Sequence, residues 1–448
     1  MTTIQLTNNK KTITLEIQQL IIYKQAKIIE ATNNQNQYYS IIFYKDRFIN
    51  AKKTSSIRLQ SFLRTALTNG YTFSGDHPLI KALLSGDKSF RLTTNNQMVT
   101  KLQDKYNDIE MLYILAMFDN FLDEKKIQAL CRKTFYQYRR NGQVFKAFRI
   151  LINFVQIRPP HDKFAQDMLH HFDFQKFSDQ YKDIDQLTKK WSDPLYLESV
   201  FFEQGFPKVS INPLLQQYHI DNRKFDQLSL YFLNDSQMDD LTKLSNLAKE
   251  LLTEKGQVQL WELLLKEQQN SEQIIKKLVE LNSYTAILNY YLNNPQSNID
   301  LKLLKEALEQ IPSHELIENY QQLLSILTTS FKNDSAQLDK VLHVAIKKLL
   351  KHLSLPDILE SLSDTELPII KKIKKMEQLS DNPDKQLALG EIYYNLELYD
   401  QAITCFEWEM ELSPNNPAPI NYLYKCYQAK GDKEQANTYR QLMANIPS

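Results

Sequence analysis

Two short stretches of this chain have the residue types that metal-dependent catalysis requires. His161-Asp162 and His170-His171-Phe172-Asp173 each combine histidine with aspartate. Adjacent His and Asp side chains can share a metal ion, as in metal-dependent phosphohydrolases. The sequence indicates no further ligands for either stretch, so histidines on helix surfaces are the favoured interpretation. We predict no catalytic residue, no metal site and no cofactor.

Motifs of the common enzyme classes are absent from the sequence. It contains no GxSxG, no HExxH and no Walker-type GK[ST] segment. Its three cysteines, Cys131, Cys405 and Cys426, form no CxxC pair and are too few for a disulfide framework. Sparse cysteine is typical of a reducing compartment. With no signal-peptide pattern at the N-terminus and no run of about 18 apolar residues, we expect a cytoplasmic protein without catalytic activity.

The region from Lys125 to Arg149 is rich in basic and aromatic residues, which are the residue types that bind nucleic acid. Cations attract phosphate groups, and exposed aromatic rings can stack on bases. The alternative is that the aromatic residues form the core and the cations a solvated helix face, which the helical spacing of Phe135, Tyr138, Phe145 and Phe148 favours. No DNA- or RNA-binding signature accompanies the region. The possible nucleic-acid patch consists of Arg132, Lys133, Arg139, Arg140, Lys146 and Arg149.

Charge is unevenly distributed along the chain, although the formal net charge is only +1. Residues 1–158 contain 24 Lys and Arg against 11 Asp and Glu, whereas acidic residues outnumber basic ones in the remainder. Such asymmetry favours an acidic partner for the first part, nucleic acid included. It is equally consistent with attraction between the two parts, within one chain or between chains.

The composition predicts that the candidate metal-binding and nucleic-acid-binding residues lie on helices. Only 8 glycines occur among 448 residues, fewer than β-hairpins with primed turns or phosphate-binding loops need. Helices joined by turns of Asn, Asp, Ser and Pro are the better interpretation. The length predicts two to four domains or one extended array of repeats.

The first 50 residues differ from the rest of the chain. Around Leu15, apolar and polar residues alternate with period two, as in a half-buried strand. The runs Ala26–Ala31 and Tyr38–Tyr44 are predicted to form a hairpin through Asn33–Gln37. We expect a small sheet of three to four strands.

Helices are predicted after this sheet. Ser55 or Ser56 is expected to cap a helix that ends at Gly70, and Asn95–Thr100 is expected to be a connector. From about residue 221 onward, helix–turn–helix units recur at loose intervals of roughly 30 to 40 residues, which is typical of an α-solenoid. Three helices are predicted over Asp108–Phe121, Glu124–Arg140 and Val144–Ile157, with a stop at Pro159-Pro160.

The last 66 residues carry the most specific pattern. Segment Pro383–Asn416 contains Leu389-Gly390, Tyr393, Tyr399, Ala402, Phe406 and Pro414. This spacing resembles the tetratricopeptide repeat (TPR), a helix hairpin of about 34 residues. Small residues at Gly390 and Ala402 let the two helices approach, and the aromatic residues fill the remaining space.

A second segment from Pro417 matches the same family less closely. It has Leu423, Tyr427, Gly431, Ala436 and Pro447 at corresponding places. Tyr424 stands where the family has a small residue, and Glu409 departs in the same way in the first repeat. Because about three repeats are needed for a stable array, upstream helices are expected to stack on these two. Trp191, Trp261 and Trp408 are expected to anchor hairpins to one another.

The resemblance implies a partner-binding groove lined by the first helix of each hairpin. Asn side chains can bind an extended peptide backbone, and Tyr offers amphipathic contact area. The alternative is that these are solvated surface residues. The basic residues with which some family members clamp a C-terminal carboxylate are not evident here. The implied groove residues are Glu391, Tyr394, Asn395, Asn421, Tyr422 and Lys425.

The fold predicted as a whole is mostly α, with a helical-repeat, TPR-like solenoid body and a small N-terminal α+β segment. Its expected parts are a basic α+β head (1–100), a partly basic helical region (101–220), degenerate helical hairpins (221–382) and two TPR-like repeats (383–448). The predicted function is a scaffold or adaptor that binds a peptide or helix of another protein. The alternative is a nucleic-acid-associated or regulatory protein that uses residues 1–158.

Overall fold

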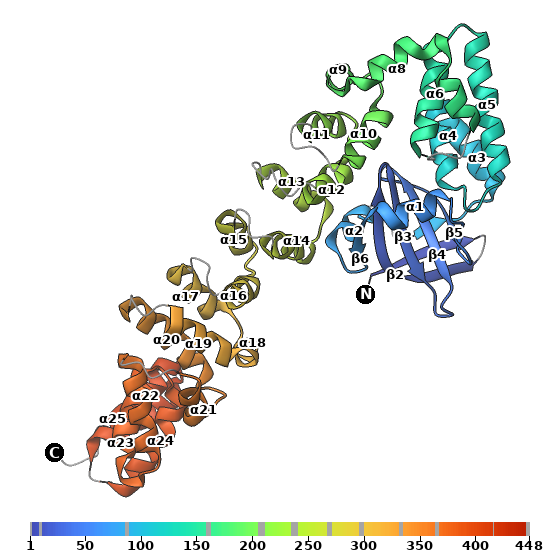
Figure 1. Cartoon of the computed structure of the whole chain (residues 1–448). Coiled ribbons are helices and arrows are strands. Elements are labelled where there is room, and N and C mark those ends of the chain that lie inside the picture. Colours follow the sequence, from blue (N-terminus) through green and yellow to red (C-terminus); the bar gives the residue numbers. More distant parts are fainter. Residues whose placement is uncertain are drawn as a thin grey trace. The chain divides into compact units, whose positions relative to one another are not determined.

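The computed structural model divides into two compact units, Met1–Leu260 and Trp261–Ser448, which are described separately (Figure 1). The fold is mostly α, as predicted, and no helix of the described chain is long and apolar enough to span a bilayer. His161, Asp162, Pro159-Pro160 and Pro447 lie outside the described residues. The structure describes residues 2–8, 11–85, 89–157, 163–204, 211–233, 241–266, 271–294, 300–330, 335–362, 367–414 and 416–444.

Seven strands in the described part of the chain form one sheet in the first unit. Its order is β5-β4-β3-β2-β1-β7, and β6 pairs with β2 beside β1. The predicted hairpin is confirmed as β3 and β4, but the sheet has more strands than the three to four expected. Strands β6 and β7 are too short to show a period in the sequence, and β5 was not predicted. The strands are β1 (Thr3–Asn8), β2 (Lys11–Tyr23), β3 (Ala26–Thr32), β4 (Tyr38–Tyr44), β5 (Arg47–Lys53), β6 (Tyr71–Ser74) and β7 (Ser89–Arg91).

Strand β2 organises the sheet because it pairs along one edge with β1 and then with β6. Leu15 is buried on β2, as the alternation predicts. From Leu20 onward both faces of β2 are buried, and the Tyr23 ring contacts Phe62 and Phe202 at centroid distances of 5.4 and 5.3 Å. Gly75 follows β6, and a Cβ atom there would lie 2.2 Å from the Ile17 carbonyl oxygen, so this close approach requires glycine.

Helices account for the rest of the first unit. The three helices predicted between residues 108 and 157 are confirmed as α4, α5 and α6, although α4 ends before Phe121. The helices and the one 3₁₀ turn are α1 (Phe62–Asn69), α2 (Pro78–Leu83), α3 (Asn95–Lys105), α4 (Asp108–Met117), α5 (Glu124–Arg140), α6 (Val144–Ile157), α7 (Lys163–Leu169), η1 (Phe172–Phe174), α8 (Gln175–Lys182), α9 (Ile184–Lys190), α10 (Pro194–Glu203), α11 (Ile211–Ile220), α12 (Lys224–Leu233) and α13 (Leu241–Leu251), and α14 (Glu254–Lys266) crosses the division.

Two predictions about the starts of helices are wrong, one because of a tertiary contact and one because of a local capping box. Helix α1 is capped by Ser61 and not by Ser55 or Ser56, because the carboxylate of Asp119 accepts the Phe62 backbone N–H at 2.9 Å and fixes the start of the helix there. The connector expected at Asn95–Thr100 belongs to α3. Thr94 and Gln97 form a capping box at its N-terminus.

A buried network of charges joins the sheet to helices α10 and α12. Lys27 on β3 forms an ion pair with Asp226, and Arg223 contacts Glu198 at 2.6 Å and Asp226 at 2.7 Å. Burial lowers the pKa of Lys27, and the negative charge of Asp226 acts in the opposite direction and raises it. Burial alone would raise the pKa of Asp226, but the charges of Arg223 and Lys27 lower it. The neighbouring cations therefore hold Asp226 in its ionised form.

Ion pairs within the first unit account for part of the uneven charge of the sequence. Residues of the basic first 158 positions pair with acidic residues that follow them in the chain. Attraction within one molecule, one of the alternatives that the sequence left open, therefore operates in this protein. These pairs are Lys24–Glu203, Lys27–Asp226, Arg139–Asp173 and Arg149–Asp193.

The second unit consists of helices that mostly contact their neighbours in sequence. Helix α20 is an exception, since it also contacts α17 and α22. The helices and the one 3₁₀ turn are α15 (Ser271–Glu280), α16 (Tyr284–Asn293), α17 (Leu301–Gln310), α18 (Ser313–Glu318), α19 (Tyr320–Ser330), α20 (Ser335–Leu349), α21 (Leu355–Glu360), α22 (Pro368–Ser380), η2 (Pro383–Lys385), α23 (Gln386–Asn395), α24 (Tyr399–Leu412), α25 (Pro417–Lys430) and α26 (Lys433–Ala444).

Two helix hairpins, α23–α24 and α25–α26, end this unit (Figure 1). A Cβ atom on Gly390 would lie 2.6 Å from the ring of Phe406, so the two helices of the first hairpin approach closely at this glycine. Gly431 ends α25 in a left-handed conformation with φ of 76°. Trp261 is buried, whereas Trp408 is 52% exposed, which is more than expected of an anchor between hairpins.

Candidate functional site

The predicted groove residues lie on two helices that contact each other, α23 and α25. Helix α23 carries Glu391, Tyr394 and Asn395, and helix α25 carries the other three. Their helices are held together by the hydrophobic cluster around Phe406, on which the Tyr422 ring stacks at 4.8 Å with an interplanar angle of 9°. Packing of the hairpins thus fixes the positions of these side chains.

Four of the six side chains form one connected cluster, which we call the tyrosine face: Glu391, Tyr394, Tyr422 and Lys425. The Tyr394 and Tyr422 rings meet edge to face at 5.5 Å, and the Lys425 ammonium lies 5.2 Å from the centre of the Tyr422 ring. Burial, and then the charge of Glu391, raise the pKa of Tyr422, so the Glu391 carboxylate lies close to this hydroxyl. The cluster combines half-buried rings with one charge of each sign.

The remaining two predicted groove residues flank this cluster. Asn395 lies at the C-terminal end of α23 and Asn421 lies in the first half of α25, and both side chains are exposed. Each amide offers two donors and one acceptor oxygen. The tyrosine face with its two flanking amides can therefore bind an amphipathic segment and hydrogen-bond to its backbone.

The structure does not bring the six cations of the possible nucleic-acid patch together as free charges. Arg139 pairs with Asp173, and Arg149 donates two hydrogen bonds of 3.0 Å to Asp193. Asp193 is fully buried and also accepts from Tyr181 at 2.8 Å. These two arginines therefore hold the helices together.

The other four cations of the patch, Arg132, Lys133, Arg140 and Lys146, are exposed. Arg132 lies over the Phe164 ring at 4.8 Å and Lys146 over the Tyr138 ring at 5.6 Å. Phe135 and Phe148 are buried, as the alternative interpretation of this region expects.

The histidines of the second His-Asp stretch make local contacts. His171 accepts the backbone N–H of Asp173 at 3.4 Å and so caps the turn η1. His170 contacts the Gln166 carbonyl oxygen at 2.8 Å. The described residues contain no group of three or more His, Cys, Asp or Glu side chains placed to hold a metal ion.

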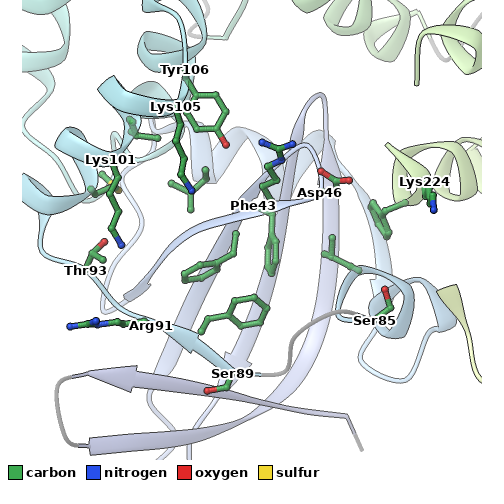
Figure 2. Close-up of a pocket in the computed structure, with 18 of the residues that line it drawn as sticks. Phe43, Asp46, Ser85, Ser89, Arg91, Thr93, Lys101, Lys105, Tyr106 and Lys224 are labelled. Atoms are coloured by element: carbon green, nitrogen blue, oxygen red, sulfur yellow. The ribbon is translucent and has the colours of Figure 1, made fainter. Parts of the chain in front are cut away.

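A pocket of about 670 Å³ in the first unit is a site that sequence reasoning missed; we call it the basic pocket. Helix α3, strands β5 and β7, and the turn between β4 and β5 line it, and residues after α2 and at the start of α12 complete its wall (Figure 2). Lys101 and Lys105 reach from α3 toward the sheet in this view. The sequence predicted a connector in place of the first half of α3, so it did not place these two lysines on one helix face.

Three phenylalanine rings form an aromatic floor in the basic pocket. Phe43 packs against Phe48 and Phe90 at centroid distances of 5.7 and 5.6 Å, and Phe48 and Phe90 lie 4.6 Å apart. Phe43 is buried, whereas Phe48 and Phe90 are half-buried. Part of the floor is therefore accessible from the pocket.

Asn50 fixes one wall of the basic pocket from its place on β5. Its buried side chain donates to the Thr93 carbonyl oxygen at 2.9 Å and accepts the Thr93 backbone N–H at 3.2 Å. Thr93 is held beside α3 in this way. Its Oγ1 atom is buried and has no hydrogen-bond partner within the described chain.

Basic side chains predominate around the basic pocket. Lys224 forms an ion pair with Glu250, and Asp46 is the carboxylate among the described lining residues. Burial raises the pKa of Tyr106 while the positive charge of Arg47 lowers it, which places Arg47 near the Tyr106 hydroxyl. Four lining cations form no ion pair with another described residue: Arg47, Arg91, Lys101 and Lys105.

No protein-family model, curated protein or solved structure matches the chain. Function must therefore be argued from the side chains themselves. Two surfaces have the composition of binding sites: the tyrosine face in the second unit and the basic pocket in the first.

Proposed function

We propose that this protein is a cytoplasmic adaptor without catalytic activity, which binds a peptide or helix of another protein on the tyrosine face. The observation that carries the proposal is the contact of Tyr394 with Tyr422, flanked by Glu391 and Lys425. Residues that the resemblance to TPR proteins implies as groove residues thus lie on helices that contact each other. That proximity supports a shared role for them.

The chemistry of the tyrosine face suits an amphipathic segment. Tyrosine supplies rigid contact area with a polar tip and is enriched at protein interfaces. Glu391 and Lys425 offer one charge of each sign, which can fix the direction of a bound segment. The amides of Asn395 and Asn421 can pair with its backbone.

A second exposed feature of the same hairpins supports a protein partner. Trp408 and Leu412 lie four residues apart on α24, and each is 52% exposed. Residues at this spacing share one helix face. An exposed tryptophan is more typical of an interface than of the remaining surface of a protein.

The proposal is tested by peptide selection from a random library displayed on phage, with the full chain as bait. We expect wild-type protein to enrich related sequences and the double variant Tyr394→Ala with Asn421→Ala to bind the enriched peptides at least tenfold more weakly. Asn437→Ala, an exposed change on α26, is the control and should leave binding unchanged. Circular dichroism would verify that all variants are folded.

Equal binding by wild type and double variant would show that the tyrosine face does not bind the selected peptides. The alternative, association with nucleic acid through Arg132, Lys133, Arg140 and Lys146, makes a different prediction. Partners captured from lysate would then be lost on nuclease treatment, and affinity would fall steeply with added salt, because several phosphate contacts release counterions.

A further inference from the structure

We propose that the basic pocket is a binding site for a nucleoside phosphate. The proposal is independent of the adaptor function, since the pocket lies in the first unit. It rests on three features that meet in one cavity: cations without an ion-pair partner in the described chain, a buried hydroxyl that likewise has no partner there, and an accessible aromatic floor. Each feature matches one part of a nucleotide.

The positive charges of the pocket are complementary to the negative charges of phosphate groups. Lys101 and Lys105 are one helical turn apart on α3, so their ammonium groups repel each other. Arg47 adds a third charge from the start of β5. Asp46 neutralises only part of this total. Bound phosphate would offset the remaining repulsion and accept charge-assisted hydrogen bonds, which are stronger than neutral ones.

Thr93 matches a phosphate or sugar oxygen. Its hydroxyl is buried and has no partner among the residues that the structure describes, although buried polar atoms in proteins are as a rule hydrogen-bonded. Thr93 and Lys101 both line the pocket (Figure 2). The paired hydrogen bonds between Asn50 and Thr93 hold the Thr93 backbone in place, which keeps its hydroxyl at this wall of the pocket.

The phenylalanine floor matches a base. Phe48 and Phe90 are half-buried and present aromatic surface to the pocket. Stacking on such rings is favourable for every base, because each base has a π-face. Tyr106 adds a further ring at the edge of the pocket.

The dimensions favour a small molecule over a nucleic-acid strand. A volume of about 670 Å³ lies within the range of about 300–1,000 Å³ typical of small-molecule sites. Lys224 at the start of α12 lines the pocket from the side opposite α3 in the view of Figure 2. The cavity has walls on opposite sides, whereas a nucleic-acid strand needs a groove that is open at both ends.

The test is isothermal titration calorimetry of the full chain with ATP, GTP, CTP and UTP, and with tripolyphosphate and adenosine. We expect saturable binding of at least one nucleotide at one site per chain. Tripolyphosphate should bind roughly tenfold more weakly than that nucleotide, because it cannot use the aromatic floor. Adenosine should bind more weakly still, because it lacks the phosphates.

Variants then locate the site. Lys105→Ala and Thr93→Val should each weaken nucleotide binding roughly tenfold or more, because each removes a hydrogen bond to a charged group. Lys105→Arg should retain most of the affinity. Lys125→Ala removes an exposed lysine of α5 outside the pocket and is the matched control, with no expected effect.

Three outcomes would overturn the proposal. One is the absence of binding by all four nucleotides to folded wild-type protein. Another is equal binding of tripolyphosphate and nucleotide, which would mean that the aromatic floor has no part. The third is affinity for a single-stranded oligonucleotide that grows with its length, which would mean a strand-binding surface.

Discussion

His77 caps helix α2 with a neutral imidazole. Its Nδ1 atom accepts the Leu79 backbone N–H at 3.2 Å, and its ring packs against Phe73 and Phe232 at 4.6 and 5.3 Å. Burial, opposed by the charge of Asp76, lowers the pKa of His77 from 6.5 to about 4. Protonation would convert the accepting nitrogen into a donor and break the cap.

The lowered pKa of His77 predicts that the free energy of unfolding depends on pH. Because the unfolded chain takes up a proton near pH 6.5 and the folded protein only near pH 4, the contribution of His77 is complete above pH 6.5 and is lost as the pH falls toward 4. The expected loss is roughly 1–3 kcal/mol of unfolding free energy. His77→Asn retains a capping side chain without titrating, so it should lose less stability over this range in urea unfolding.

The control for this prediction is His314→Asn, since the His314 side chain is 77% exposed. It should follow the wild-type pH dependence, because carboxylates elsewhere titrate equally in both proteins. Identical curves for wild type and His77→Asn would show that the neutral imidazole does not act in this way.

At the scale of elements, the hairpin α23–α24 depends on the absence of a side chain at Gly390. A Cβ atom there would lie 2.6 Å from Phe406 Cε1 and 2.9 Å from Cδ1, well inside normal contact distance. Phe406 is fully buried and has little room to move. One methyl group would therefore push the two helices apart.

Gly390→Ala should lower the free energy of unfolding by up to about 2 kcal/mol. Overpacking typically costs 1–3 kcal/mol, and the better helix propensity of alanine offsets about 1 kcal/mol of it. Urea unfolding measures the difference. The double variant with Phe406→Leu should be less destabilised than the sum of the two single changes, because the smaller side chain relieves the contact. Simple additivity would contradict the proposed clash.

At the scale of the whole molecule, the first unit depends on residues far apart in sequence. Lys27 is 1% exposed and meets its partner Asp226 nearly two hundred residues later in the chain. Removing one partner of a buried pair typically costs about 3–5 kcal/mol. A chain that ends at residue 158 would bury this charge without a partner.

We therefore expect a fragment of residues 1–158 not to fold cooperatively, and a fragment of residues 1–266 to do so. Thermal unfolding followed by circular dichroism would distinguish a cooperative transition from a gradual change. In the shorter fragment, Lys27→Met should restore part of the stability, because it replaces the unpaired charge by an apolar side chain. A cooperative transition of the unmodified shorter fragment would show that the buried network is dispensable.

Local patterns in the sequence determined many of the elements. Alternation around Leu15, the hairpin of β3 and β4, and the helices α5 and α6 are set by neighbouring residues, because side-chain periodicity and turn residues act over a few positions. The approach of two helices at Gly390 follows equally from one small residue facing one large one. The resemblance of the last 66 residues to TPR proteins implied the residues of the tyrosine face.

Only the tertiary structure decided which side chains from distant segments meet. The start of α1 depends on Asp119, and Arg149 is held in an ion pair by Asp193. The basic pocket is assembled from segments between Phe43 and Leu251, none of which carries a motif of its own. Such encounters depend on how the helices and the sheet pack together, and sequence periodicity records only which face of each element is buried.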